Sequence, residues 1–295
     1  MKFRNYHIIL FCVVCLLGGC EPKWDFGSID FEPQIVVEGW IENGEFPCVC
    51  LTQTKTLDMP MDSMTMLDVP IRWAKVTVSD GKQTEILTGK MDWNYTPPFV
   101  YKGRQMRGEI GKTYTLTVEY SGRTVTAITT IPEPVPLSRL VVEKCEDSDT
   151  LFQIKAYFHD DRSVRNYYKF FTRVWAENKR FYSSFFGTFD DNVLAEDGEA
   201  SLSVFRGFRH TNIKKYTPFY KEKDSVAVKF TQLPEDGFNF WSDYENEVTN
   251  GKNPIFPSST NVRSNVKGGL GIWCGYGINT YFVAIEDSLK KYGYK

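Results

Sequence analysis

The chain has 295 residues, of which 42% are hydrophobic and 24% are charged, and its formal net charge is -2. This composition is that of a folded protein long enough for two domains, and it excludes an intrinsically disordered chain. The nearly balanced charge argues against nucleic acid or a polybasic membrane contact, because both require clustered positive charge.

Residues 1–19 are typical of a lipoprotein signal peptide. Lys2 and Arg4 precede an apolar run from Ile8 to Leu17, which is shorter than the roughly 20 residues that a membrane-spanning helix requires. The run ends in Leu-Gly-Gly before Cys20, and small residues before a cysteine suit a lipoprotein signal peptidase. We therefore predict cleavage before Cys20, lipid on Cys20, and a tether at 20–33. An ordinary secretory signal with an incidental cysteine is the alternative.

Residues 34–132 alternate short apolar strands with turn dipeptides, a pattern that predicts an Ig-like antiparallel β-sandwich. Asn43-Gly44, Asp80-Gly81 and Ser121-Gly122 each separate two apolar runs. Asn-Gly in this position predicts a tight hairpin with positive φ at its central residues. A Met-rich loop at 59–66 is interpreted as packing over an open end of the sandwich or as an adaptable contact surface.

The three prolines within 132–136 predict a semi-rigid connector and the end of the first domain. Residues 137–295 are again rich in strands, so we predict a second antiparallel β domain. Aromatic residues occupy both faces of the strand at 167–175. Such a strand is expected to be buried between two layers, or to offer a platform on which sugar or peptide rings stack.

One helix is predicted in the second domain, over residues 235–250. Its apolar residues recur at intervals of three and four, acidic residues follow Pro234, and Gly251 suits the end of the helix. The apolar residues of this pattern are Phe238, Trp241, Tyr244 and Val248. The helix is expected to pack across the sheet.

Four cysteines remain after the signal peptide and the lipidated residue are set aside: Cys48, Cys50, Cys145 and Cys274. Cys48 and Cys50 share one face of a predicted strand, so they are poorly placed to bond each other. We expect buried or disulfide-paired structural cysteines. The two histidines of the mature chain, His159 and His210, do not complete a zinc site, and we predict neither a metal site nor a cofactor.

Motifs of catalysis are missing from the sequence, and we predict no catalytic residues and no enzymatic activity. The glycines at 268–271 do not form a dinucleotide fingerprint, because the segment continues into a strand and has Cys274 where a glycine is required. The acidic residues between 190 and 199 offer hard oxygen ligands for calcium but fit no EF-hand spacing, so a solvated acidic loop is expected.

Several segments together resemble a known family. They are IVVEGWIENGE at 35–45, IRWAKVTVSDG at 71–81, GKTYTLTVEYSGRTVTAITTIPEPVPL at 111–137, and FNFW at 238–241 followed by NPIFPSSTNVRSNVKGGLG at 253–271. The chain resembles the Bacteroidota outer-membrane lipoproteins catalogued as domain of unknown function 4249. The resemblance implies a lipid-anchored protein of the outer membrane, on its surface or periplasmic face, that accompanies a TonB-dependent transporter and has no assigned catalytic residue.

The irregular segment after the helix is our predicted partner-binding region, because such excursions usually serve binding. Its candidate contacts are Asn261, Arg263, Asn265, Lys267 and Trp273. The alternative is that the asparagines tie the segment to its own backbone. The resemblance adds candidate O-glycosylation sites at Ser63, Thr150, Ser225 and Ser288. The expected function is thus a non-catalytic accessory of a TonB-dependent transporter, with a glycan or a peptide as ligand; the alternative is a cell-surface adhesin or matrix lipoprotein.

Overall fold

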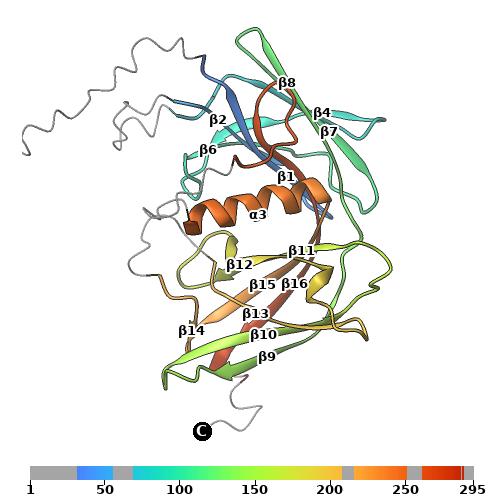
Figure 1. Cartoon of the computed structure of the whole chain (residues 1–295). Helices are drawn as coiled ribbons and strands as arrows, with labels where there is room; N and C mark the ends of the chain where they lie inside the picture. Colours follow the sequence, from blue (N-terminus) through green and yellow to red (C-terminus); the bar gives the residue numbers. More distant parts are fainter. Residues whose placement is uncertain (1–31, 56–68, 208–215, 251–260, 287, 289–295) are drawn as a thin grey trace, which may run out of the picture. The chain divides into compact units, whose positions relative to one another are not determined.

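The computed structural model describes residues 32–55, 69–207, 216–250, 261–286 and 288 (Figure 1). Cys20, Ser63 and the predicted loop at 59–66 lie outside the described residues. Within them the chain is mainly β; its bounded helices are the α-helix α3 (Glu235–Asn250) and the short 3-10 helix η2 (Asp191–Val193), and residues 285, 286 and 288 are also helical. The predicted β fold with one packed helix is confirmed, and α3 covers the residues that the apolar periodicity indicated.

The largest sheet has eight strands in the order β12-β11-β15-β16-β1-β2-β6-β5. Their bounds are β1 Ile35–Glu42, β2 Cys48–Gln53, β5 Thr88–Met91, β6 Phe99–Lys102, β11 Tyr167–Val174, β12 Tyr182–Asp190, β15 Ser225–Leu233 and β16 Leu270–Ala284. Neighbouring strands run antiparallel except β1 and β16, which are parallel.

Two smaller sheets each have four strands. One has the order β4-β3-β7-β8, with bounds β3 Lys75–Ser79, β4 Thr84–Ile86, β7 Thr113–Tyr120 and β8 Arg123–Thr130. The other has the order β13-β10-β14 with β9 also paired to β10, and its bounds are β9 Leu137–Lys144, β10 Leu151–His159, β13 Glu199–Val204 and β14 Tyr220–Lys221.

Each small sheet contributes to a separate hydrophobic core with part of the large sheet. The first core joins Val37 and Leu51 of the large sheet to Val76 and Leu116 of the β4-β3-β7-β8 sheet. The second core is aromatic and joins residues such as Phe170 and Phe230 of the large sheet to Ile154 and Phe158 of β10. The molecule therefore contains two β-sandwiches that share one sheet.

Strand β16 connects the two sandwiches. Its first half pairs with β1, from Leu270 to Tyr276, and its second half pairs with β15, from Gly277 to Ala284. The large sheet thus crosses the boundary predicted at 132–137. Gly271 has a φ of +105°, and a Cβ at this position would overlap the carbonyl of Val37, so the parallel pairing depends on glycine here.

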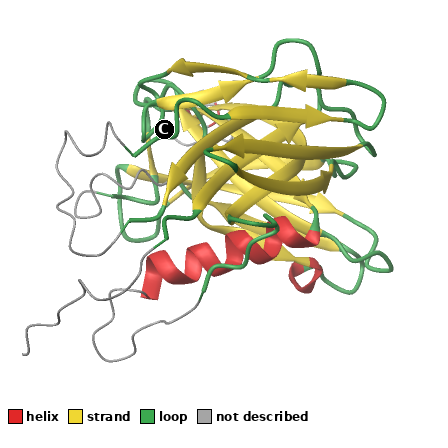
Figure 2. Cartoon of the chain, turned by 90° about the horizontal axis from the view of Figure 1, so that it is seen from above, coloured by secondary structure: helices red, strands yellow, loops and turns green. Residues whose placement is uncertain are grey.

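Helix α3 lies on the face of β16 opposite to the first core, and Figure 2 shows the long helix running along one side of the strands. Because side chains alternate along a strand, Trp273 points into the first core while Ile272 and Cys274 pack beneath the helix. Gly237 in the first turn permits the close approach, since a Cβ there would lie 2.5 Å from the Cys274 sulfur. Strand β11 is enclosed in the same way: Tyr168 faces the second core and Tyr167 faces the helix. The expectation of an aromatic strand between two layers is confirmed.

The hairpin signals differ in how closely the structure follows them. Ser121-Gly122 forms the predicted two-residue turn between β7 and β8, with φ values of 50° and 74°. Asn43-Gly44 also connects two antiparallel strands, but the connection runs from 43 to 47 and only Gly44 has positive φ. The predicted tight primed turn is therefore wrong at Asn43-Gly44, where the longer loop relieves Asn43 of the left-handed conformation.

Candidate functional site

A pocket of about 870 Å³ opens beside α3, on the outer face of the large sheet. Strands β1 and β16 form its floor, α3 forms one wall, and residues 179–186 together with Tyr95 form the opposite wall. Many aromatic side chains line it: Trp40, Phe46, Tyr95, Phe171, Phe181, Tyr182, Phe185, Phe186, Phe240, Trp241, Tyr244 and Tyr276. The volume lies within the range of about 300–1,000 Å³ that is typical of small-molecule sites.

The floor follows from the alternation of β1. Val37 and Ile41 are buried in the first core, so the intervening residues Glu38, Trp40 and Glu42 face the pocket. Trp40 stacks on Tyr95, with ring centroids 6.1 Å apart and an interplanar angle of 24°. The floor thereby combines two carboxylates with an aromatic surface.

The helical wall is fixed by a buried ion pair. Lys169 of β11 is fully buried, and its Nζ lies 2.7 Å from Glu245 Oε1 of α3 and 2.8 Å from Thr188 Oγ1 of β12. The same Nζ lies 4.3 Å from the ring centroid of Trp241. Burial lowers the pKa of Lys169 and Glu245 opposes that change. The ion pair holds α3 against the sheet, and it thereby also holds in place the aromatic rings that α3 contributes to the pocket wall.

The opposite wall includes a distorted part of β12. The register between β11 and β12 shifts between Lys169 and Phe171, and Phe186 has a φ of +48°, which is costly for an aromatic residue. Phe186 is 56% exposed and packs against Phe185 with centroids 4.2 Å apart. The distortion places both phenylalanines among the lining residues.

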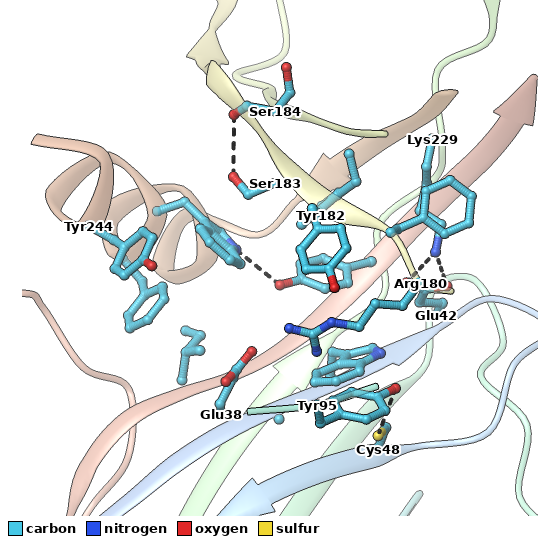
Figure 3. A pocket seen from close by; sticks show the side chains of 18 of the residues that line it. Glu38, Glu42, Cys48, Tyr95, Arg180, Tyr182, Ser183, Ser184, Lys229 and Tyr244 are labelled. Carbon is cyan, nitrogen blue, oxygen red and sulfur yellow. Dashed lines mark hydrogen bonds and ion pairs between the residues drawn. The ribbon is translucent and has the colours of Figure 1, made fainter. Parts of the chain in front are cut away.

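Arg180 and Glu38 are the charged pair at the centre of the pocket (Figure 3). The Arg180 guanidinium lies over the ring of Tyr95 at 4.6 Å and over the ring of Tyr182 at 5.0 Å. Its Nε is buried and has no hydrogen-bond partner among the described residues. Burial raises the pKa of Glu38, and the charge of Arg180 opposes this increase. The two groups attract each other without forming a salt bridge.

A second charge pair lies near the floor. Lys229 Nζ lies 2.7 Å from both carboxylate oxygens of Glu42 and 4.4 Å from the ring centroid of Phe181. Both side chains are nearly buried, at 10% and 12% exposure. Because Lys229 and Glu42 already satisfy each other, a ligand gains less from them than from Glu38 and Arg180.

The four described cysteines are all free. Cys48, Cys50 and Cys274 are buried, as expected, whereas the alternative of disulfide pairing is not realised among them. Burial raises the pKa of Cys48 to about 12, despite the nearby hydroxyl of Tyr95 at 4.0 Å. A thiol with this pKa is neutral near pH 7 and is a poor nucleophile.

Two of the predicted partner contacts have structural roles. The Arg263 guanidinium forms two hydrogen bonds to the Asp243 carboxylate of α3, at 2.7 Å and 2.9 Å, and the pair lowers the pKa of Asp243. The Asn265 amide binds the backbone of Trp273 on both sides, donating to its carbonyl at 2.8 Å and accepting from its N–H at 3.0 Å. The second arrangement agrees with the alternative in which asparagine ties down the segment.

The other three predicted contacts differ in accessibility. Asn261 and Lys267 are exposed, although the backbone of Lys267 pairs with that of Thr126. Trp273 is fully buried, and its indole N–H donates to the carbonyl of Tyr114 at 3.0 Å. The prediction that Trp273 contacts a partner is therefore wrong, because strand alternation turns its side chain into the first core.

The remaining candidate residues are spread over the chain. Thr150 and Ser225 are exposed, and Ser288 is half-buried with its hydroxyl donating to the carbonyl of Ala284. Among the described residues there is no cluster of histidine, cysteine or carboxylate side chains suited to hold a metal ion. In the acidic loop, Asp190 caps η2 and pairs with Arg165.

Sequence reasoning missed Glu38 and Arg180 as site residues. A signal for Glu38 exists, because IVVEGWIE alternates and places Glu38 and Trp40 opposite the apolar residues of β1. Arg180 lies between two strands far along the chain, and its approach to Tyr95 depends on the pairing of β1 with β16. Local periodicity carries no information about that pairing.

No described helix is long and apolar enough to cross a membrane. A family model described as "Domain of unknown function (DUF4249)" matches residues 23–281. The match includes both sandwiches, α3 and most of β16. The comparison with curated proteins finds no match.

Proposed function

The chain belongs to the DUF4249 family, and from this membership and the aromatic pocket we propose a non-catalytic binding protein of the outer membrane. Lipid on Cys20 anchors the protein, a ligand occupies the pocket, and a TonB-dependent transporter is the partner. The observation that carries the proposal is the pocket of about 870 Å³, whose lining combines aromatic side chains with charged groups; its volume and its aromatic surface are those of a small-molecule site.

The state of the polar groups favours binding over catalysis. Lys229 is tied to Glu42 and Lys169 to Glu245, so neither amine is free to act as a base. The lining residues include no histidine within the described part of the chain, and the Cys48 thiol is protonated near neutral pH. General acid–base and nucleophilic catalysis both need a group poised near the working pH, and the Glu38 carboxyl, whose pKa is raised by burial, is the lining group on which a catalytic role would have to rest.

Ligand binding is tested by thermal denaturation of the detergent-solubilised full-length protein. Three pools are added separately: neutral oligosaccharides, short peptides, and small aromatic acids. A ligand present at about 100 times its Kd stabilises the folded state by about 2.7 kcal/mol, so at least one pool is expected to raise the melting temperature. If all three pools leave it unchanged, the proposed binding function is wrong.

Anchoring is tested with Cys20→Ala in the full-length chain. Because the lipid is attached through the cysteine sulfur, the variant is expected to lose incorporation of a palmitate analogue and to leave the membrane fraction. Cys145→Ser is the matched control, since Cys145 is half-buried and unpaired, and it should label like the wild type. Continued labelling of Cys20→Ala would contradict the lipidation proposal.

Partnership is tested in the same membranes by co-purification in mild detergent. The transporter is expected to be recovered with the wild type and lost with Lys267→Glu, because exposed charges govern encounter more than folding. Lys82→Glu, an exposed lysine in the β3–β4 turn, should retain the transporter. Equal recovery of the transporter with both variants would show that this segment is not the interface. No recovery of the transporter with the wild type would contradict the proposed partnership.

A further inference from the structure

We propose that the pocket binds a neutral saccharide, with hydroxyl groups of one sugar ring bridging Glu38 and Arg180 and the ring faces packed against aromatic side chains. This inference rests on the proposed binding function and names its ligand class. It uses two charged groups of the pocket, Glu38 and Arg180, between which the described residues form no salt bridge.

The first step is the unsatisfied state of Arg180. Its Nε is buried without a hydrogen-bond partner among the described residues, although buried polar groups are nearly always paired. Tyr95 and Tyr182 cover the guanidinium at 4.6 Å and 5.0 Å, so its N–H groups can donate only in the plane between the rings. An acceptor placed in that plane would satisfy the group.

The second step is the complementary state of Glu38. Its side chain projects from β1 into the pocket and is accessible to solvent, and no hydrogen bond to it is formed by the described residues. An ionised carboxylate accepts hydrogen bonds only, and a guanidinium donates only. In Figure 3 the end of the Arg180 side chain is directed toward Glu38. The site therefore offers one acceptor and one donor close together.

These two groups select a ligand that donates and accepts at neighbouring positions. Vicinal hydroxyls do this without carrying charge, because each hydroxyl is both a donor and an acceptor. The opposite charges of Glu38 and Arg180 cancel, so a strongly anionic or cationic ligand would meet one attractive and one repulsive group. A neutral polyhydroxyl ring avoids that conflict.

The aromatic walls supply the apolar half of the recognition. Trp40 and Tyr95 stack on one side, and on the helix Phe240 and Tyr244 stack with centroids 6.2 Å apart and an angle of 6°. The C–H face of a sugar ring is apolar and flat enough to pack on such rings, which present broad hydrophobic surfaces. The volume of about 870 Å³ leaves room for more than one sugar ring and is large for a single amino acid.

An extended peptide is the less favoured occupant. Peptides that add to a sheet need a free strand edge with unpaired N–H and C=O groups. The floor strand β1 is paired on both edges, to β2 and to β16. The floor therefore presents side chains to a ligand and no row of backbone groups.

Isothermal titration and tryptophan fluorescence on the detergent-solubilised full-length protein test the inference. The probes are neutral trisaccharides built from glucose, mannose, galactose or N-acetylglucosamine, with uncharged capped tripeptides as comparators. At least one trisaccharide is expected to bind and to change the emission of the pocket tryptophans. Arg180→Met and Glu38→Gln should each weaken it at least about tenfold, which corresponds to about 1.4 kcal/mol.

Matched controls separate the site from general effects. Arg139→Met removes a guanidinium that lies 4.1 Å over Tyr157, away from the pocket lining, and Glu119→Gln removes an exposed carboxylate; both should bind like the wild type. If Arg180→Met does not fold, Arg180→Lys replaces it, because it keeps the charge and lacks the planar fork. Its affinity is expected to fall as well.

Three outcomes would overturn the inference. Binding of tripeptides without any trisaccharide would make the ligand class wrong while the proposed binding function stands. If Arg180→Met and Glu38→Gln both bind the trisaccharide like the wild type, the saccharide site lies elsewhere on the protein. No binding of any probe up to about 10 mM, which is about ten times a weak Kd of 1 mM, would overturn the saccharide class, and the three-pool denaturation then decides whether the binding function falls with it.

Discussion

Glu38 is open to solvent on one side and surrounded by protein atoms on the others, and this position raises the pKa of its carboxyl. Burial is the larger cause, and the nearby charge of Arg180 acts in the opposite direction. The other titratable groups that face it are two thiols and two phenols, all with pKa values that are themselves raised: Cys48, Cys50, Tyr244 and Tyr276. Near neutral pH these four are uncharged, so Arg180 alone balances the carboxylate.

Replacing Glu38 with Gln should therefore stabilise the unliganded protein at pH 7–8. A carboxyl whose pKa is higher in the folded state than in the unfolded state disfavours folding when ionised, and this cost disappears as pH falls from the raised pKa toward the ordinary value. The gain in melting temperature of Glu38→Gln is expected to shrink on acidification and to vanish near pH 4. Scanning calorimetry between pH 4 and pH 8 measures this gain in melting temperature. A gain that is independent of pH would contradict the raised pKa of Glu38.

Residue types alone predicted the location of the polar segment after α3 but not the orientation of its side chains. The residue type of Asn265 predicts that it ties down backbone, because asparagine bonds backbone readily, and its amide does bind the backbone of Trp273. Trp273 follows Asn265 by eight positions, and its side chain faces the core because β16 pairs with β1 in the register that sets Trp273 beside Gly39. A shift of one residue in that register would turn every side chain of β16 to the other face, and no local signal specifies the register.

Helix α3 is the element whose placement the pocket depends on most directly. Its periodicity and charge predicted its extent, and the contact of Trp241 with the sheet followed from the same pattern: the indole N–H donates to the Tyr276 hydroxyl at 3.0 Å. Lys169 was not predicted as a buried residue, because a lysine within an aromatic strand is expected to reach solvent. Its partner Glu245 lies on a different element, so sequence alone did not join them.

Removing Glu245 should loosen this wall. Glu245→Ala leaves Lys169 buried without its counter-ion, and breaking a buried pair from one side costs about 3–5 kcal/mol. Lys169→Met together with Glu245→Leu replaces the pair by apolar side chains of similar size and should recover most of that loss. Chemical denaturation of the two variants measures the difference. A loss well below 1 kcal/mol for Glu245→Ala would show that the pair does not hold the helix.

At the scale of the whole molecule, the two sandwiches were predicted from their strands, whereas their common sheet was not. Turn dipeptides and alternation are local signals, and they identified strands on both sides of the proline-rich connector. The pairing of β1 with β16 joins residues such as Val36 and Leu270, which are distant in sequence. Because β16 contributes to both cores, loss of either half of the strand is expected to affect both sandwiches.

Gly271→Ala tests this coupling. The variant combines a left-handed backbone with an overlap onto the Val37 carbonyl, so the expected loss is at least about 3 kcal/mol. Gly111→Ala is the matched control: it also has positive φ, but no atom lies within 4 Å of its Cβ position, and its expected cost is about 1–2 kcal/mol. Calorimetry should show one unfolding transition that moves to lower temperature as a unit. Two separate transitions, with only one displaced, would contradict the coupling.

The position of β16 in the sheet also determines when, during synthesis of the chain, the strand β1 can acquire its second neighbour. A chain emerges from the ribosome with its N-terminal part first, so β1 (Ile35–Glu42) is made long before β16 (Leu270–Ala284). Until β16 arrives, one edge of β1 has no neighbour, and the first core lacks Trp273. An open strand edge is a template for unwanted pairing between chains. The first sandwich is therefore expected to complete its core only after β16, the last strand of the described chain, has been made and has paired with β1 and β15.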